Sequence, residues 1–574
     1  MPCGRARAGL DGVSSVRAER EDRPPVPTEG TAGSEEEDAV PGFTYPELPL
    51  DGLLRAAAAR DPDGRAVTTA AGAVTFAELD AGADRIAHAL RRTVRRGATV
   101  AVAGALDAVF PAAYYGTARA GCTVALVNPL LSEAALRHVF TAARVEAALV
   151  PTALAERLTK LSDRLPALRT VVVTDADDGV VPADAVPLAA VLRPAPEEPF
   201  GLGEGSADTT AVVCLQFTTG TTGRPKGVRL THRNLVANAA QIAHAHRLGP
   251  HAVTLNHLPL FHTMHLNSAV YAGAHQVLCQ DPDPVASLDL AARAGATHHY
   301  GLPARLHRLA ADPRLDGAAG RLRGGPLTVV MSGGSALAPS AAHRLRDALG
   351  VPVIQGYGMT ELSPLAHNQR PDDPVGRGAV GRALPGTESR IVGLDDREPL
   401  PAGAVGELQV RGPQVMAGYL HDEEPSRIDA EGWFSTGDVG RLDDDGVLHL
   451  VDRLDDVFKH DNELVSPAAV ERVLAEDPRV AECVVADWPD PVHGGVVWAG
   501  VVLRPSAVPP DGPPHAVLDV LDSVAERANE HLAPFERIRR LEAVDAVPRT
   551  PTGKPARREI RRRLHRSAAA ENAA

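Results

Sequence analysis

The stretch Phe217-Thr218-Thr219-Gly220-Thr221-Thr222-Gly223-Arg224-Pro225-Lys226-Gly227-Val228 is rich in small and hydroxylated residues and contains one lysine. It follows the apolar run Ala211–Leu215, so the sequence predicts a buried strand that ends in a flexible loop. Backbone N–H groups, hydroxyls and the Lys226 ammonium suit a polyphosphate. The spacing differs from the G-x-x-x-x-G-K-[ST] nucleotide loop. Taken alone, the stretch is explained equally well as a mobile surface turn.

Length and composition limit the class of protein. The 574-residue chain is too long for one hydrophobic core, so two or more domains are expected. Its net charge of -14 argues against binding to nucleic acid or an anionic membrane. The sequence shows neither an apolar run long enough to span a membrane nor a signal-peptide pattern at its N-terminus. The five cysteines are scattered without metal-ligand spacing, so we expect a cytoplasmic protein.

The order of secondary-structure patterns predicts an α/β fold. Strand and helix patterns alternate from Pro46 to Ile354, which favours βαβ units and a mainly parallel sheet. Short strands and turns between Gly381 and Leu450 predict a small β-rich subdomain, and a small α+β segment follows it. We therefore expect four parts, namely a disordered extension (1–43), a large N-terminal domain (44–452), a mobile C-terminal domain (453–564) and a disordered tail (565–574).

A second candidate motif, Gln355-Gly356-Tyr357-Gly358-Met359-Thr360-Glu361, follows the apolar run 351–354. Its glycines allow a ligand close to the backbone, and Tyr357 offers a ring face. Thr360 and Glu361 offer a hydroxyl and a carboxylate suited to phosphate and Mg²⁺. On its own the motif could equally be a turn at a strand end.

Two further segments each place one charged residue after a glycine. Ser435-Thr436-Gly437-Asp438 provides a carboxylate that could bind a ribose diol or cap a turn. Pro548-Arg549-Thr550-Pro551-Thr552-Gly553-Lys554 places one lysine on a constrained loop, where a solvated surface lysine is the ordinary explanation.

In this order, the four segments resemble those of the adenylate-forming superfamily, which includes acyl-CoA synthetases, adenylation domains that load carrier proteins, and beetle luciferases. The resemblance runs from about residue 46 to 564. It also includes Leu230–Leu235 after the phosphate loop, Ser332–Leu337 on the adenine side, and Gly406–Gly412 with Gly418-Tyr419. It implies a large N-terminal domain and a small C-terminal domain that rotates between two half-reactions, with Asp455 at the hinge position.

The resemblance also implies the cofactors, ATP and Mg²⁺ with CoA as a possible acceptor, and the roles of individual residues. Glu361 would hold Mg²⁺, and Lys554 would bridge the reacting oxyanion and the α-phosphate. Asp438 would take the ribose hydroxyls with support from Arg453, and Tyr357 would stack on adenine. Thr360 and Lys459 are further catalytic candidates. The remaining ATP contacts would come from Thr218, Thr219, Gly220, Thr221, Thr222, Gly223, Lys226, Ser335, Ala336, Gln355 and Gly356, and the acid pocket from His262, Met264, His265, Gly333, Gly334 and Gly358.

The chain departs from the family pattern at two positions. Thioester-forming relatives usually have glycine where this chain has Asn462, close to the path of the pantetheine arm. Either the asparagine obstructs that tunnel, or it keeps the turn and points away. The family commonly has Phe-His-x-x-Gly where this chain ends in His265. An imidazole there would shorten the acid pocket or make it polar, although a structural role for His262 or His265 is equally plausible.

Three hypotheses for function follow. The first is a ligase that adenylates a small or aromatic carboxylate and passes it to CoA or a carrier protein. The second is a diazotase that activates nitrite with ATP and diazotises an aryl amine in secondary metabolism, which a polar pocket at His265 and a blocked tunnel at Asn462 would suit. The third is a catalytically silent nucleotide-binding relative, which is disfavoured by the presence of Lys226, Glu361, Asp438 and Lys554.

Overall fold

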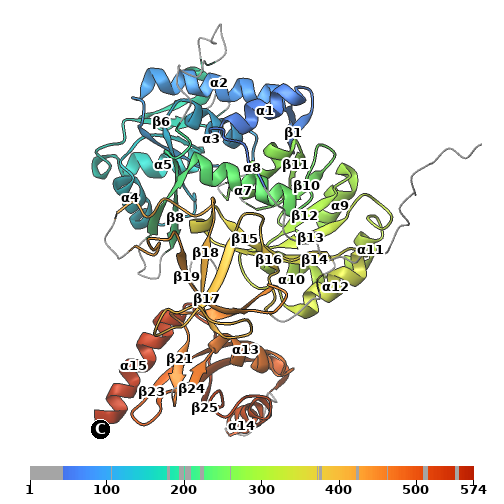
Figure 1. The fold of residues 1–574 in the computed structure, drawn as a ribbon, viewed down its shortest axis with the longest axis vertical. Coiled ribbons are helices and arrows are strands. Elements are labelled where there is room, and N and C mark those ends of the chain that lie inside the picture. The colour runs from blue at the N-terminus through green and yellow to red at the C-terminus, as the bar shows by residue number, and fades with distance from the viewer. Residues whose placement is uncertain are drawn as a thin grey trace, which may run out of the picture. The chain divides into compact units, whose positions relative to one another are not determined.

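The computed structural model describes residues 43–573 apart from 105, 177–180, 193–199, 201–207, 220–224, 259, 261, 372, 374–377, 422–425, 462, 508–514 and 550–554. In this part of the chain α-helices accompany four β-sheets (Figure 1). The predicted extension at 1–43 lies outside the described residues except for Phe43. The α-helices are α1 (Gly52–Arg60), α2 (Phe76–Thr93), α3 (Val109–Arg119), α4 (Glu133–Ala142), α5 (Thr152–Lys160), α6 (Leu188–Val191), α7 (His232–Ala245), α8 (Met264–Ala272), α9 (Pro284–Ala294), α10 (Pro303–Ala311), α11 (Leu315–Ala319), α12 (Pro339–Leu349), α13 (Pro467–Ala475), α14 (Ala516–Asn529) and α15 (Arg557–Ala573).

A seven-stranded sheet has the order β7-β6-β5-β3-β4-β8-β9. All neighbours are parallel except β8 and β9, which form an antiparallel hairpin. The buried Val and Ala runs of its central strands are typical of a parallel sheet that is covered on both faces. Its strands are β3 (Thr99–Val102), β4 (Thr123–Leu126), β5 (Val145–Val150), β6 (Thr170–Val173), β7 (Ala185–Pro187), β8 (Val212–Thr219) and β9 (Pro225–Thr231).

A nine-stranded sheet has the order β16-β15-β14-β13-β12-β10-β11-β1-β2. Its central strands β14, β13, β12, β10, β11 and β1 are parallel, so their carboxyl ends meet at one edge, where α/β proteins bind ligands. Its strands are β1 (Arg65–Thr69), β2 (Gly72–Thr75), β10 (Val253–Asn256), β11 (His275–Leu278), β12 (His298–Gly301), β13 (Val329–Ser332), β14 (Val353–Gly358), β15 (Leu365–Asn368) and β16 (Arg382–Ala383).

Two smaller sheets complete the described fold. The first is antiparallel and four-stranded, and it forms the predicted β-rich subdomain. The second is five-stranded and belongs to the C-terminal α+β segment. Their strands are β17 (Glu388–Val392), β18 (Gly406–Arg411), β19 (Phe434–Leu442) and β20 (Leu448–Arg453), and then β21 (Phe458–His460), β22 (Glu463–Val465), β23 (Val480–Asp490), β24 (Gly494–Leu503) and β25 (Ile538–Ala543).

The expected disordered tail at 565–574 is wrong for the described residues, because α15 continues to Ala573. Leu564 and Ala568 are 3% and 1% exposed and pack with Trp498 in one cluster. They lie four residues apart, so both fall on the buried face of the helix. An ion pair of 2.9 Å between Arg540 and Glu571 adds a contact near the helix end. The boundary between the domains at 452/453 stays a prediction.

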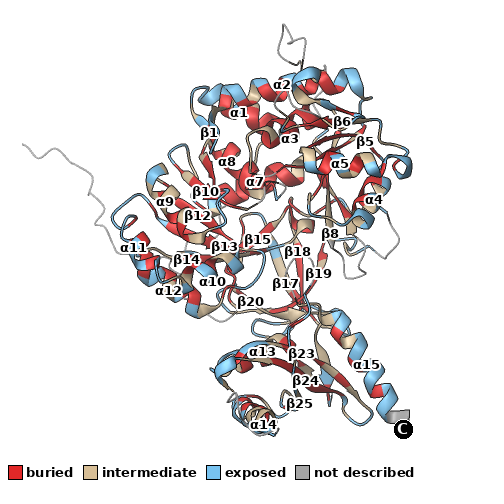
Figure 2. Ribbon diagram, turned by 180° about the vertical axis from the view of Figure 1, so that it is seen from behind, coloured by how far each residue is buried: buried red, intermediate tan, exposed pale blue. Residues whose placement is uncertain are grey.

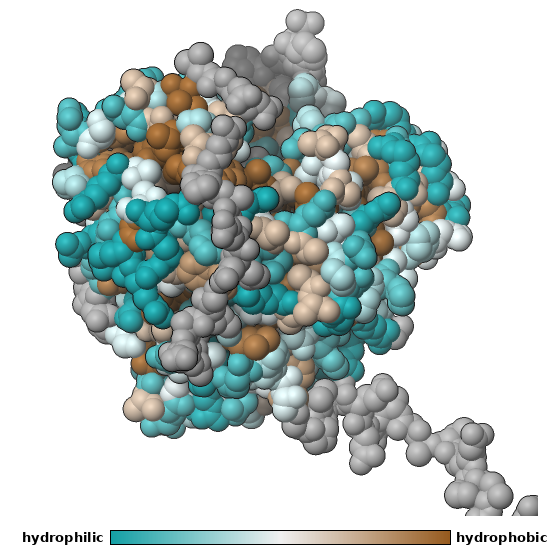
Figure 3. All heavy atoms as spheres, turned by 90° about the horizontal axis from the view of Figure 1, so that it is seen from above, coloured by the Kyte–Doolittle hydropathy of each residue, from teal (hydrophilic) through white to brown (hydrophobic). Residues whose placement is uncertain are grey.

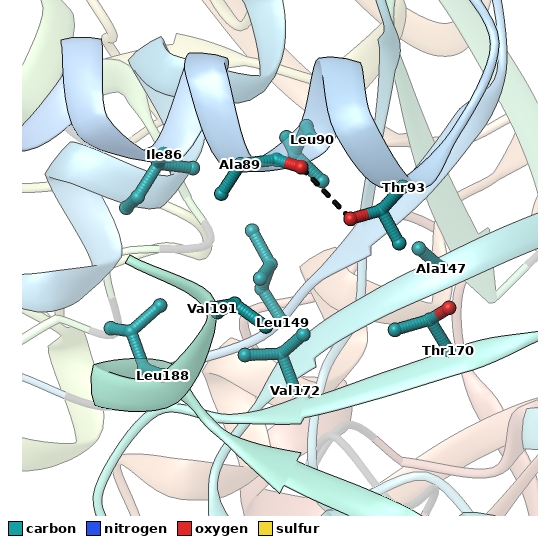
Figure 4. Close-up of a pocket in the computed structure, with 10 residues that line it drawn as sticks. All are labelled: Ile86, Ala89, Leu90, Thr93, Ala147, Leu149, Thr170, Val172, Leu188 and Val191. Carbon is teal, nitrogen blue, oxygen red and sulfur yellow. Dashed lines mark hydrogen bonds between the residues drawn. The ribbon is translucent and has the colours of Figure 1, made fainter. Parts of the chain in front are cut away.

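Buried residues lie along the strands and the inner helix faces, and exposed residues cover the outer helix faces (Figure 2). A small gap between α2 and the seven-stranded sheet is lined mainly by aliphatic side chains, and the Thr93 hydroxyl there donates to the Ala89 carbonyl (Figure 4). The gap therefore lacks the polar groups that a substrate site needs. No helix in the described part of the chain has the length and apolar character required to cross a membrane.

The described part of the surface carries few large exposed hydrophobic residues. On the face drawn in Figure 3, hydrophilic side chains lie among hydrophobic ones. Large exposed hydrophobic residues occur at separate places in the sequence, which is normal for a globular protein. Among the described residues they are Leu130, Val186, Leu302, Val405, Val492 and Leu518.

Candidate functional site

The two ends of the predicted phosphate loop pair with each other in the antiparallel strands β8 and β9. Thr218 lies opposite Lys226, and Phe217 opposite Gly227. The expectation of one flexible loop over 217–228 is therefore too broad, because both of its ends belong to strands. Cross-strand pairing fixes Lys226 beside the turn, which a free loop would not do. The predicted ligands at the turn itself, Gly220, Thr221, Thr222 and Gly223, lie outside the described residues.

Lys226 and Glu361 both interact with Tyr419. The Lys226 ammonium is 5.5 Å from the centre of the Tyr419 ring, and the Tyr419 hydroxyl donates a 2.9 Å hydrogen bond to Glu361 Oε1. A backbone bridge between Val228 and Tyr419 and a hydrogen bond from Met416 to the Glu361 carbonyl hold these segments together. The structure thus brings a predicted phosphate ligand close to a predicted metal ligand. The role of Tyr419 as the connection between them was missed, since its motif indicated only family membership.

Asp438 lies between Tyr357 and Arg453. The Tyr357 hydroxyl donates a 2.6 Å hydrogen bond to Asp438 Oδ2, and Arg453 Nη1 donates one of 2.7 Å to Oδ1. Burial and the Asp438 carboxylate raise the pKa of Tyr357 well above its ordinary value. Burial would lower the pKa of Arg453, but Asp438 raises it above the ordinary value. The three predicted nucleotide ligands therefore form one group, with a carboxylate presented between two donors.

The glycines of β14 are required by close packing. A Cβ atom on Gly356 would lie 2.8 Å from Leu365 Cδ1, and one on Gly358 would lie 1.9 Å from the Pro364 carbonyl oxygen. Gln355 Oε1 accepts a 2.8 Å hydrogen bond from the Leu337 N–H and so ties β14 to the turn after β13. At that turn, Cβ atoms on Gly333 and Gly334 would have no atom nearer than 3.9 and 3.8 Å. The exposed Ser335 and Ala336 follow on the same turn, and Thr360 begins the 3₁₀ helix Thr360–Leu362 after β14.

Three of the six predicted acid-pocket residues, His262, Met264 and His265, lie around the start of α8. His265 is 6% exposed, and its ring centre is 4.0 Å from that of Tyr300 in β12. The Tyr300 hydroxyl lies 3.0 Å from His246 Nδ1, and this contact helps to fix the Tyr300 ring on which His265 packs. Burial, followed by the neighbouring His246, lowers the pKa of His265 to about 3, and its Nδ1 has no hydrogen-bond partner among the described residues. His262 is exposed, and Met264 packs instead against a small apolar cluster that includes Ile242.

Two buried histidines near the same sheet edge were not predicted. His257 follows β10 and is 8% exposed, and His299 in β12 is 1% exposed. Their ring centres are 5.8 Å apart. In the described part of the chain, both nitrogens of His257 and Nδ1 of His299 lack a partner. Neither His257 in its apolar stretch nor His299 beside His298 carries a sequence signal that separates a ligand from a core residue.

The predicted residues of the C-terminal segment are only partly described. Lys459 is exposed and lies 3.1 Å from Asp395 Oδ2, so it is not among the residues gathered around Asp438 or Glu361. Asp455 accepts a 3.1 Å hydrogen bond from Arg558 of α15. Lys554 and Asn462 lie outside the described residues, and their roles stay predictions.

Two places have donor sets that could suit a metal ion. Glu361 is 7% exposed and offers a carboxylate beside the phosphate hairpin, which fits Mg²⁺ held by one carboxylate and substrate phosphates. Within the described ranges, His460, Asp461 and His493 form a group of possible metal ligands whose ligand atoms all lie within 4.8 Å of one another.

Comparison with known proteins gives a consistent result. The family model described as AMP-binding enzyme matches residues 54–420, and that of the AMP-binding enzyme C-terminal domain matches residues 469–554. The chain is 31% identical over 559 residues to 4-coumarate–CoA ligase 2 of Oryza sativa subsp. japonica, covering 92% of this chain and 94% of the rice protein.

Two solved structures of known enzymes are similar. An anthranilate CoA ligase, AuaEII, in complex with anthranoyl-AMP matches with a TM-score of 0.78 and 25% identity over 92% of this chain and 98% of that chain. The amide bond synthetase McbA from Marinactinospora thermotolerans matches with a TM-score of 0.76 and 29% identity over 90% and 99%. The predicted family and α/β fold class are confirmed. The chain belongs to the adenylate-forming superfamily, as an AMP-binding enzyme and an ATP-dependent, AMP-forming ligase of the acyl-CoA synthetase type.

Proposed function

We propose that this ligase activates a small or aromatic carboxylic acid as an acyl adenylate and then transfers the acyl group to CoA or a carrier protein. The observation that carries the proposal is the Asp438 carboxylate, held 2.6 Å from the Tyr357 hydroxyl and 2.7 Å from Arg453. Such a preorganised carboxylate suits the ribose hydroxyls of ATP, which would replace the phenol as its partner.

In the first half-reaction, a carboxylate oxygen of the acid attacks the α-phosphorus of ATP and pyrophosphate leaves. Lys226 would neutralise charge on the departing phosphates from beside the hairpin turn. Lys554 would stabilise the attacking oxygen and the α-phosphate, because two anions must approach each other in the transition state. Mg²⁺, when bound at Glu361, would polarise the phosphate oxygens. In the second half-reaction, the acceptor thiol attacks the acyl carbonyl carbon and AMP leaves.

The buried His265 supports a limit on the acid. Its imidazole packs on Tyr300 where a smaller residue would leave room for a longer acyl chain. Because the pKa of His265 is lowered to about 3, the imidazole is neutral at pH 7 and cannot neutralise a second carboxylate. A short or aromatic acid with an uncharged far end fits these properties better than a fatty acid or a diacid.

ATP–pyrophosphate exchange with a panel of acids tests the proposal. Benzoates and cinnamates should support exchange, whereas long-chain fatty acids should not. A panel without any exchange would overturn the proposed activation, and exchange only with fatty acids would overturn the assigned pocket. CoA-dependent release of AMP then identifies the acceptor. The variant Lys554→Ala should lose exchange by orders of magnitude while ATP binding, measured by calorimetry, remains; unchanged AMP production would rule out the assigned role.

A second candidate, ATP-dependent diazotisation, is favoured by the unpartnered Nδ1 of His265 in the described structure, which could bind an aryl amine. A nitrite oxygen would attack the α-phosphorus with loss of pyrophosphate. The aryl amine would then attack the nitrogen, AMP would leave, and loss of water would give the diazonium ion. Nitrite-dependent release of AMP that requires an aryl amine would support this reaction over thioester formation.

A further inference from the structure

Two turns of the C-terminal five-stranded sheet bring three possible metal ligands together. His460 ends β21, Asp461 follows it, and His493 lies in the turn between β23 and β24. His460 pairs with Gly494, and the Asp461 N–H donates a 3.1 Å hydrogen bond to the His493 carbonyl. Asp490 Oδ1 accepts a 2.8 Å hydrogen bond from the His493 N–H and fixes the second turn. The backbone therefore positions the group independently of its side chains.

One hydrogen-bond partner of His460 shows that its Nδ1 atom carries a proton. This residue is 5% exposed, and its Nδ1 lies 2.8 Å from the Gly495 carbonyl oxygen, which can only accept. Nδ1 therefore donates to this carbonyl, and Nε2 is the ring nitrogen that remains to bind a ligand. Fixing one ring nitrogen against a carbonyl is how proteins orient the other nitrogen toward a metal ion.

The second ring nitrogen of His460, Nε2, lies near a carboxylate. Nε2 lies 3.8 Å from Asp461 Oδ2, while Asp461 Oδ1 lies 2.8 Å from Nδ1 of His493. A cation bound by Nε2 of His460 and the Asp461 carboxylate would join these two groups. His493 and Asp461 form a pair, and His460 is oriented by its hydrogen bond to Gly495 and by stacking on the His493 ring, whose centre lies 4.9 Å from its own.

We propose that His460, Asp461 and His493 bind a divalent transition-metal ion such as Zn²⁺. Two imidazoles and one carboxylate suit Zn²⁺, Ni²⁺ or Co²⁺ better than Mg²⁺ or Ca²⁺, which prefer oxygen ligands alone. Three protein ligands leave one coordination position for water or another ligand. The side chains of His493 and Asp461 are 42% and 57% exposed, so an ion can enter from solvent. This site is separate from Glu361 and does not depend on the proposed function.

The test is a Zn²⁺ titration of the chelator-treated full-length protein against a chromophoric competitor, in excess Mg²⁺ to occupy oxygen sites. The wild-type chain should bind one equivalent of Zn²⁺. His493→Ala and Asp461→Asn should each lower the affinity for this ion by about tenfold or more. These two side chains are exposed, so both variants should fold. His343→Ala, which removes an exposed histidine on α12, is the matched control and should bind as the wild type does.

A second measurement, the thermal midpoint of unfolding, tests whether Zn²⁺ stabilises the folded chain through these residues. Zn²⁺ that binds the folded chain should raise the thermal midpoint of the wild type and of His343→Ala, but not that of His493→Ala. If the three side chains only pair with one another, the wild type should bind no more Zn²⁺ than the variants do. Equal stoichiometry and affinity in wild type, His493→Ala and Asp461→Asn would overturn the proposal.

Discussion

The Tyr357 hydroxyl donates a 2.6 Å hydrogen bond to Asp438, a residue 81 positions further along the chain. The bond joins β14 of the nine-stranded sheet to β19 of the four-stranded sheet. Since Arg453 donates to the other oxygen, the carboxylate is fixed before a nucleotide arrives. Preorganisation of this kind lowers the free-energy cost of binding, because fewer side chains have to be ordered.

Replacing Asp438 with alanine should weaken ATP binding by about ten- to hundredfold, because a hydrogen bond to a charged group contributes about 1.5–3 kcal/mol. The dissociation constant of ATP, measured by calorimetry without an acid substrate, checks this. Tyr357→Phe is the control, since it removes the phenol hydroxyl and retains the ring face. Its effect should be smaller, and equal losses in both variants would contradict a direct role for the carboxylate.

The Tyr419–Glu361 contact makes a different prediction. Glu361→Gln keeps an acceptor for the 2.9 Å hydrogen bond but removes the negative charge. The variant should fold normally and require more Mg²⁺ for half-maximal pyrophosphate exchange, because Mg²⁺ prefers anionic oxygen ligands. Tyr419→Phe keeps the carboxylate and should change the Mg²⁺ requirement less. An unchanged Mg²⁺ dependence in Glu361→Gln would remove this residue from the metal site.

The nucleotide residues could be predicted because each lies in a short motif that directly follows an apolar strand. The motifs around Tyr357, Asp438 and Lys226 carry residue types that ATP needs, so local sequence is sufficient. The contacts between them could not be predicted. The bonds from Tyr357 to Asp438 and from Tyr419 to Glu361 depend on how separate sheets and segments meet, which no local pattern specifies.

Other features have no local signal or a misleading one. His257 lies alone in an apolar stretch and His299 directly follows His298, and neither pattern separates a core role from a ligand role. The tail after Leu564 is polar and alanine-rich, which suggested disorder, yet contacts of Ala568 and Glu571 with distant residues order it as helix. Hairpin pairing between β8 and β9 likewise depends on register rather than on the glycines that drew attention to the loop.

The buried histidines predict sensitivity to acid. Burial lowers the pKa of His257 to about 2, of His265 to about 3 and of His299 to about 4. In the unfolded chain they titrate near about 6.5, so acid favours unfolding. Their contribution to stability is complete above pH 6.5 and falls by about 1.4 kcal/mol per histidine per pH unit below it. The urea midpoint should therefore be lower at pH 5 than at pH 7.5.

His265→Gln tests this origin, because glutamine does not titrate. Between pH 6.5 and 5, the unfolding free energy of the variant should fall less steeply than that of the wild type. The difference in slope should correspond to about one fewer proton taken up on unfolding. His343→Gln, at an exposed position on α12, should keep the wild-type slope. If His265→Gln and the wild type show the same slope, the buried imidazole is not responsible.

Asn462 bears on the second half-reaction alone. If its side chain obstructs the pantetheine path, Asn462→Gly should raise the rate of CoA thioester formation and leave pyrophosphate exchange unchanged. Asn462→Ala controls for backbone freedom, since it shortens the side chain without the conformational range of glycine. Faster thioester formation in both variants would indicate that the side chain obstructs the path. Faster formation in Asn462→Gly alone would indicate a constraint on the backbone. No change in either would mean that the asparagine keeps the turn and points away, so the acceptor has to be decided by the substrates themselves.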